Sequence, residues 1–166
     1  MTDTIPTPSR LWKRMPAEQR VRAAQAFWGE KEAAADQRQV AEIIAKQKNF
    51  RLKTVLALDA ERKARYLASI SELAEPLAAR VLVVYHVATQ RPMMGAFLDA
   101  LGIAHDDGLI NEDTVAPDPE KIPAGIAAIT AAYPADDVSL YLTTLLWQDP
   151  ASWSVLADFI AKEGTA

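Results

Sequence analysis

The chain has no cysteine and two histidines, and these scarcities exclude several kinds of chemistry. Without cysteine the protein has no disulfide, thiol nucleophile, iron–sulfur ligation or Cys-based zinc site. His86 and His105 are therefore the imidazole groups that remain for proton transfer or metal ligation.

Glycine is also scarce, with six residues in the chain. Neither a Gly-rich dinucleotide turn nor a phosphate loop ending in Gly-Lys-Ser/Thr can be written from them. A Gly-x-Ser-x-Gly elbow and a His-Glu-x-x-His pair are missing as well. We therefore expect no nucleotide cofactor and no catalytic set of these types.

Long apolar runs are missing too. The first ten residues contain Asp3 and two prolines instead of an apolar signal core. The longest apolar run, 122–135, is interrupted by Pro123 and Pro134 and is shorter than the roughly 18 residues of a membrane span. We expect a soluble cytoplasmic protein that does not contact a membrane.

Apolar residues recur at threes and fours along most of the chain, which is typical of helices. The pattern predicts an all-α, single-domain bundle of seven to nine helices over 9–166, with a mobile tail over 1–8. The expected helices cover 17–28, 30–48, 51–58, 60–69, 72–90, 93–101, 123–133, 137–148 and 151–162. The apolar segment 81–88 is expected at the centre of the bundle, because a helix that is apolar on nearly every side needs neighbours around it.

Prolines divide these helices. Pro16, Pro92, Pro119 and Pro150 each precede a helical pattern, where a missing N–H suits the first turn. Asp118 and Asp149 come directly before two of them and are expected to cap helix starts.

A weak internal similarity relates 81–101 to 139–159, with Gln90-Arg91-Pro92 matching Gln148-Asp149-Pro150. Both segments read as helix, corner, helix. A shared packing solution and a true duplication both remain open.

The segment 103–118 has no helical period, and so long a loop is usually mobile or functional. Gly102 is expected to end the preceding helix in a left-handed conformation, with Ile103 folding back on Leu98. Asp107-Gly108 is expected to form a turn. Asp106, Asp107, Glu112 and Asp113 lack the spacing of a calcium loop, so a solvated acidic loop without metal is expected.

His86 followed by His105-Asp106 resembles the ligand pattern of the HD phosphohydrolase superfamily, which is also all-α. The resemblance implies a divalent metal held by these three residues together with Asp136, Asp137 or Asp149, which would activate water against phosphate. In that family the His-Asp doublet usually lies on a helix, whereas Gly102 precedes it here. A metal-dependent phosphohydrolase is therefore kept as an alternative.

The candidate site consists of His86, Arg91, His105, Asp106 and Asp107. For His86, on an apolar helix, a hydrogen-bonded core position is the competing interpretation. For Arg91, contact with carbonyls at the helix end competes with an anion clamp. Trp147 is expected in the core, and Trp153 in the core or at an interface.

Charge is distributed unevenly: residues 1–80 carry 15 Lys/Arg and 10 Asp/Glu, whereas 81–166 carry 3 and 12. A basic face would draw on Arg10, Lys13, Arg14, Arg20, Arg22, Lys46, Lys48, Arg51 and Lys53. The overall acidity argues against nucleic-acid binding, and we expect the two halves to neutralise each other within one molecule or a homo-oligomer.

The sequence therefore favours a non-enzymatic interaction or regulatory module that binds a protein partner or itself. A metal-dependent phosphohydrolase and a small-ligand-binding bundle are the alternatives.

Overall fold

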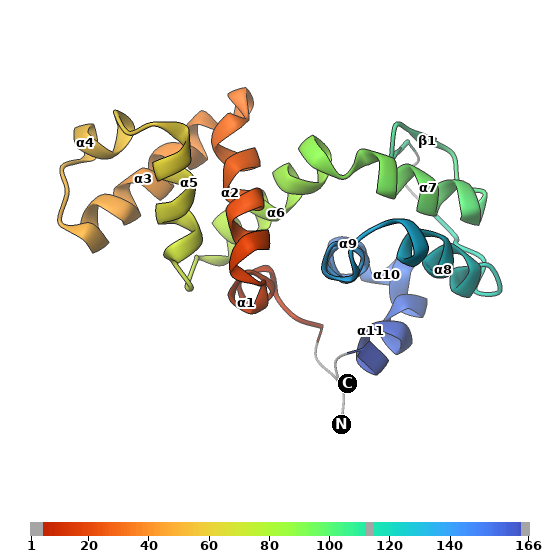
Figure 1. Cartoon of the computed structure of the whole chain (residues 1–166). Coiled ribbons are helices and arrows are strands. Elements are labelled where there is room, and N and C mark those ends of the chain that lie inside the picture. Colours follow the sequence, from red (N-terminus) through yellow and green to blue (C-terminus); the bar gives the residue numbers. More distant parts are fainter. Residues whose placement is uncertain (1–4, 112–114, 164–166) are drawn as a thin grey trace. The chain divides into compact units, whose positions relative to one another are not determined.

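The computed structural model describes residues 5–111 and 115–163, and most of these residues are helical (Figure 1). The predicted all-α class is confirmed. The chain divides into two compact units. We call Pro8–Thr89 the N-terminal unit, and Met1–Thr7 with Gln90–Ala166 the C-terminal unit. The single domain expected over 9–166 stays a prediction, because this division describes only how each unit packs internally.

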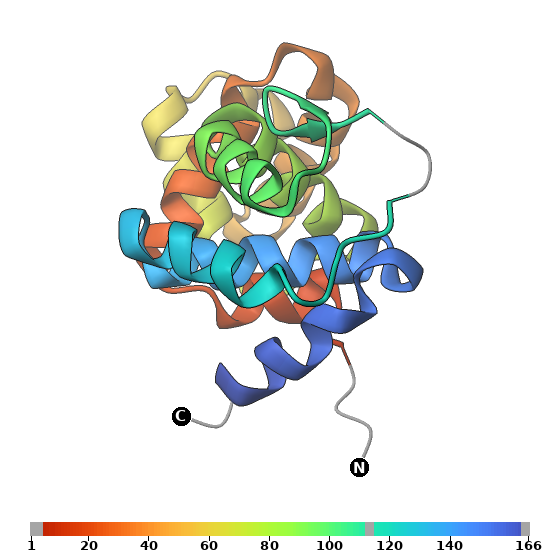
Figure 2. The same cartoon turned by 90° about the vertical axis from the view of Figure 1, so that its right-hand side faces the viewer.

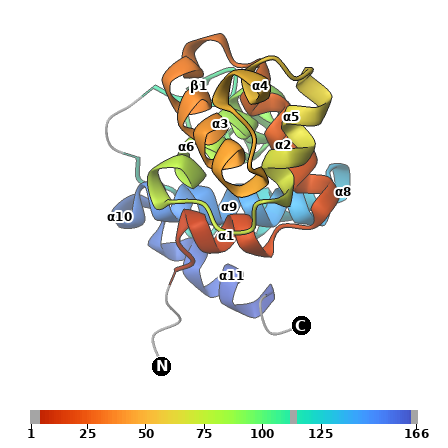
Figure 3. The same ribbon diagram turned by 90° about the vertical axis from the view of Figure 1, so that its left-hand side faces the viewer.

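The N-terminal unit is built from six α-helices with one 3₁₀ turn. They are α1 (Pro8–Arg14), α2 (Ala17–Gly29), the turn η1 (Lys31–Ala33), α3 (Ala34–Lys48), α4 (Leu52–Leu56), α5 (Ala60–Ser69) and α6 (Glu75–Thr89). Helix α2 packs against α5 and α6, and α1 packs against α6. Figure 3 shows the short helix α4 in the connection between α3 and α5.

Helix α1 is held in the N-terminal unit by a buried tryptophan. Trp12 is fully buried and donates its Nε1–H to the carbonyl oxygen of Ile70 at 2.7 Å. Three residues earlier in the same helix, the hydroxyl of Ser9 donates to the carbonyl oxygen of Leu73 at 2.8 Å. These bonds satisfy carbonyls in the non-helical connection before α6 and attach α1 to it.

Several helix ends in the N-terminal unit are set by local chemistry. Asp59 precedes α5, and its Oδ1 accepts the N–H of Arg62 at 2.8 Å. This N–H lies in the first turn, where backbone donors have no partner within the helix. Asn49 ends α3 in the left-handed conformation with φ 56°, and Phe50 N–H then donates to Ala45 O at 2.9 Å. This cap turns the chain away from α3 into the connection that holds α4.

The C-terminal unit contains a short hairpin among its helices. Its elements are α7 (Arg91–Leu101), β1 (His105–Asp106), β2 (Leu109–Ile110), α8 (Ile122–Ala132), α9 (Ala135–Gln148), α10 (Pro150–Trp153), the 3₁₀ turn η2 (Ser154–Leu156) and α11 (Ala157–Glu163). The hairpin contacts α7, and α8 packs against α7 and α9 (Figure 2).

Phe97 is the centre of the core of the C-terminal unit. Its ring lies edge-on to Tyr141 of α9 with centroids 5.7 Å apart, and 6.1 Å from the ring of Trp153 in α10. Helix α8 approaches the same ring at Gly125, where an added Cβ would lie 3.2 Å from Phe97 Cε2. One aromatic side chain thus joins four helices, as aromatic core residues commonly do. The core position expected for Trp153 is confirmed, whereas Trp147 is half-buried.

Helix starts and stops differ from expectation at three places. The prediction of a helix start at Pro119 is wrong: Asp118 Oδ1 accepts Glu120 N–H at 3.0 Å in a turn, and α8 begins at Ile122 with Pro123 in its first turn. Helix α1 was not expected, because its seven residues show too little apolar periodicity. The helix expected over 151–162 is divided by η2.

The two similar segments keep the proline corner and differ after it. Asp149 caps α10 through Oδ1 and the N–H of Ser152 at 3.2 Å, as expected, whereas Gln90 provides no side-chain cap to α7.

In the expected tail, Ile5 packs against the core of the C-terminal unit, and residues 1–4 lie outside the described part. The apolar segment of α6 is buried as expected, with Val81, Leu82 and Tyr85 almost fully covered. No described helix combines the length and apolar composition needed to cross a membrane.

Tyr141 gives the core of the C-terminal unit a pH dependence. Burial raises the pKa of its phenol above the ordinary value of about 10, because the anion would lose its hydration. The stabilisation that this provides is complete below the pKa of the unfolded chain and is lost as pH rises above it. In urea unfolding, the wild type should therefore lose stability above about pH 10 relative to Tyr141→Phe, which keeps the ring. Parallel stability curves for the two proteins would contradict this.

Candidate functional site

The His-Asp-Asp-Gly segment forms a tight β-hairpin. His105 pairs with Ile110, and Asp106 pairs with Leu109 in antiparallel register. The two residues between them, Asp107 and Gly108, have φ values of 50° and 88°. Two successive positive φ values define a type I′ turn, for which Asp-Gly is a preferred sequence. The expected turn is confirmed, but the segment around it is a hairpin and not a plain loop.

The end of α7 brings this hairpin back toward the helix. Gly102 has φ 69°, and Ile103 N–H donates to Leu98 O at 3.0 Å. This six-residue closure is the Schellman motif, and Ile103 packs on the core as expected. The chain therefore reverses direction at Gly102.

Two glycines allow the hairpin to lie against α7. A Cβ at Gly108 would lie 2.7 Å from the carbonyl oxygen of Arg91 and 3.2 Å from Gly95 N. A Cβ at Gly95 would lie 3.3 Å from Cε1 of His105. Gly108 therefore requires the absence of a side chain, both for this contact and for its positive φ, whereas a Cβ at Gly95 would make a tight contact with the ring of His105.

Both ring nitrogens of His105 are engaged inside this element. Its Nδ1 lies 2.9 Å from Gly108 N and accepts that N–H, so the proton of the neutral ring is on Nε2. Nε2 lies 2.7 Å from Asp99 Oδ1 and donates to it. A general base or a metal ligand needs a ring nitrogen with a free lone pair, whereas here Nδ1 bonds within the hairpin and Nε2 ties the hairpin to α7.

The other two charged candidates in the hairpin lie at its surface. Arg91 Nη1 is 3.4 Å from Asp107 Oδ2, so the guanidinium at the start of α7 pairs with the turn. Asp106 is exposed and has no ion pair among the described residues. Both hairpin carboxylates thus face solvent, and Asp107 is the one that is paired.

His86 lies in α6 of the N-terminal unit and is buried. Its Nδ1 is 2.7 Å from the carbonyl oxygen of Leu82, one turn earlier, to which it donates. This is the hydrogen bond of a core histidine. His105 and Asp106 belong to the C-terminal unit, so neither unit by itself contains the pattern of the HD phosphohydrolases.

Across 5–111 and 115–163, no group of three or more His, Asp or Glu side chains is placed to hold a metal ion. Of the carboxylates considered as a fourth ligand, Asp149 caps α10 and Asp137 is buried in the first turn of α9. Glu112 and Asp113 lie outside the described residues. The described geometry therefore adds no support to the phosphohydrolase alternative.

A different feature stands out in the N-terminal unit, at the end of α3 and in α4. Phe50 and Leu56 are the large hydrophobic residues that the described chain exposes, at 39% and 42% of their surface. Phe50 lies edge-on to Tyr66 of α5, with ring centroids 5.8 Å apart. Val55 between them is fully buried and holds α4 in place. Exposed apolar side chains that are fixed in this way are typical of contact surfaces.

Four cations occur in the same stretch of the chain as these apolar residues. Lys46, Lys48, Arg51 and Lys53 are all exposed, and no acid occurs between Glu42 and Asp59. Lys48 lies over the ring of Tyr66, with Nζ 5.8 Å from its centroid. The other three have no ion pair within the described part of the chain. We call Lys46, Lys48, Phe50, Arg51, Lys53 and Leu56 the 46–56 surface; Figure 3 shows the elements that carry it.

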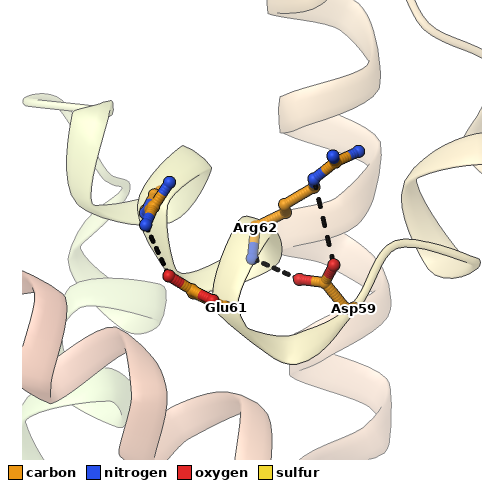
Figure 4. A network of polar contacts seen from close by, with 4 residues as sticks. Asp59, Glu61 and Arg62 are labelled. Carbon is orange, nitrogen blue, oxygen red and sulfur yellow. Dashed lines mark hydrogen bonds and ion pairs between the residues drawn. The ribbon is translucent and has the colours of Figure 1, made fainter.

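Other cations of the N-terminal unit are neutralised by neighbours. On α5, Arg62 pairs with Asp59 at 3.8 Å and Arg65 with Glu61 (Figure 4). Lys13 pairs with Glu72 at 3.0 Å, Arg38 with Glu42 at 3.5 Å and Arg80 with Asp36 at 3.3 Å. These five cations are paired with carboxylates, whereas Lys46, Arg51 and Lys53 have no ion pair among the described residues.

Sequence reasoning identified the four lysines and arginines but not the two apolar residues. Leu56 falls within the helix expected over 51–58, whereas Phe50 lies between two expected helices. The structure exposes both side chains, Phe50 directly after the cap at Asn49 and Leu56 at the end of the short helix α4. The acid-free stretch between Glu42 and Asp59 was the available signal.

Comparison with known proteins gives no functional information, because no protein-family model, curated protein or solved structure matches the chain.

Gly108→Ala tests whether the hairpin is a structural element. The substitution should lower the free energy of unfolding by more than about 2 kcal/mol, because a positive φ costs a side chain roughly 1–2 kcal/mol and the Cβ also meets Arg91 O. Gly29→Ala is the matched control, since a Cβ there has nothing within 4 Å. Equal unfolding midpoints in urea for the two variants would show that the close approach of the hairpin to α7 is not maintained.

Proposed function

We propose that this chain is a non-enzymatic protein-interaction module and that the 46–56 surface binds an acidic protein segment. The main support for the proposal is that three unpaired cations and the exposed Phe50 and Leu56 belong to the same surface. Charged groups of one sign steer and select a partner, and apolar anchors supply affinity. A segment with carboxylates and a few large apolar side chains meets both requirements.

A protein segment is favoured over a nucleic acid or a membrane by the charge of the rest of the chain. The whole protein has a net charge of −4, and the C-terminal unit carries 13 Asp/Glu against 3 Lys/Arg. An extended polyanion would repel this acidic unit of the same molecule. A short acidic segment can contact the 46–56 surface alone.

The hairpin of the C-terminal unit supports the non-enzymatic part of the proposal. Its histidine is the residue best suited to catalysis there, and both of its nitrogens make hydrogen bonds to Gly108 and Asp99. Catalytic roles require a nitrogen that can exchange a proton with a substrate.

Fluorescence anisotropy with a labelled peptide of glutamate and leucine residues tests the proposal. The wild type should bind it at low salt and should not bind the same peptide with every glutamate replaced by glutamine. Lys46→Gln/Arg51→Gln/Lys53→Gln should weaken binding about tenfold, because exposed ion pairs contribute about 0.2–1 kcal/mol each. Phe50→Ser/Leu56→Ser should weaken it through the apolar contact, with the salt dependence unchanged.

The matched control removes the same charge from paired cations. Lys13→Gln/Arg38→Gln/Arg62→Gln changes the net charge equally and leaves the 46–56 surface intact. Equal weakening by both triple variants would mean that net charge alone attracts the peptide, and the proposed site would be wrong. Preferential binding of an oligonucleotide or of phosphatidylserine vesicles by the wild type would also overturn it.

A further inference from the structure

We infer that the acidic partner of the 46–56 surface is a second copy of this chain, which binds through its C-terminal unit. This inference rests on the proposed function and names the partner for the same surface. It makes the molecule complementary to itself, with a basic contact surface on one unit and its acidic counterpart on the other.

The separation of charge follows the boundary between the units. The N-terminal unit carries 15 Lys/Arg and 9 Asp/Glu, a net charge of +6, whereas the C-terminal unit carries 3 and 13, a net charge of −10. Two copies therefore attract each other when unlike units meet and repel each other when like units meet. Charge complementarity of this kind favours one mode of association over the others.

The C-terminal unit has exposed carboxylates available for such a contact. Asp99 and Asp107 are engaged by His105 and Arg91. Asp106, Glu120 and Asp136 are exposed and have no ion pair among the residues that the structure describes. Their negative charge is complementary to the positive charge of Lys46, Arg51 and Lys53 in the N-terminal unit.

A contact between unlike surfaces leaves one surface of each kind unused in a simple pair of molecules. Such a heterologous contact can add further copies unless the arrangement closes into a ring or a reciprocal dimer. Self-association should therefore rise with protein concentration and weaken with salt, because exposed charges are screened over about 10 Å at 0.1 M ionic strength.

Sedimentation velocity on the full chain at low salt tests this with two variants. The basic-surface variant is Lys46→Gln/Arg51→Gln/Lys53→Gln, and the acidic-unit variant is Asp106→Asn/Glu120→Gln/Asp136→Asn. Each lacks one side of the contact, so each should self-associate about tenfold more weakly than the wild type. An equimolar mixture should form a complex of two chains, because the first variant keeps the acidic unit and the second keeps the basic surface.

The control variant Lys13→Gln/Arg38→Gln/Arg62→Gln should self-associate like the wild type, because its 46–56 surface is intact. The glutamate–leucine peptide should dissociate the wild-type assembly, and its glutamine counterpart should not. Association that persists in both the basic-surface variant and the acidic-unit variant would overturn the inference. An equimolar mixture of these two variants that contains only single chains would overturn it as well.

The failure of this inference is distinguishable from failure of the proposed function. A wild type that binds the acidic peptide and stays monomeric at all concentrations would keep the interaction module and exclude the second copy as its partner. A wild type that neither binds the peptide nor self-associates would overturn both.

Discussion

The C-terminal unit depends on the burial of one ring, that of Phe97, among helices that all reach it. Helix α8 reaches it because Gly125 has no side chain, and α9 and α10 contribute Tyr141 and Trp153 to the same cluster. In the N-terminal unit, Trp12 has a comparable place, where its hydrogen bond to Ile70 O joins α1 to the connection before α6. A large aromatic residue buries more apolar surface than any other side chain, so positions of this kind determine where the neighbouring helices lie. The exposed residues of the 46–56 surface lie outside these two clusters.

The hairpin shows how a histidine can join a turn to the end of a helix. A left-handed glycine ends α7, a type I′ turn reverses the chain, and His105 bonds to both the turn and the helix. Histidine suits this position because one ring can accept from a backbone N–H and donate to a carboxylate at the same time. A histidine followed by aspartate in the sequence is therefore not enough to indicate a metal site. The contacts of both nitrogens decide its role.

The surface proposed for binding contains cations that have no ion pair among the described residues, whereas several other cations of the N-terminal unit are paired. Five cations of the N-terminal unit are paired with carboxylates, some of them far away in the sequence, such as Lys13 with Glu72 and Arg80 with Asp36. The stretch from Lys46 to Lys53 has no acid within reach, and the left-handed cap at Asn49 directs Phe50 into the same surface. Charge without a partner next to exposed apolar groups is stabilised when a molecule of opposite charge covers both. The C-terminal unit has the required opposite charge, with 13 Asp/Glu against 3 Lys/Arg.

The sequence alone determined the helical class, most helix bounds, the cap at Gly102 and the turn at Asp107-Gly108. These features depend on residues within a few positions of one another, through backbone sterics, capping and the period of apolar residues. Tertiary structure alone decided which charges are paired, which apolar residues stay exposed, and that His105 contacts Asp99 and Gly108 while His86 contacts Leu82. Side-chain exposure and ion pairing depend on where distant segments pack, which a local sequence pattern does not determine. Val55 and Leu56 are adjacent apolar residues, yet Val55 is buried and Leu56 is exposed.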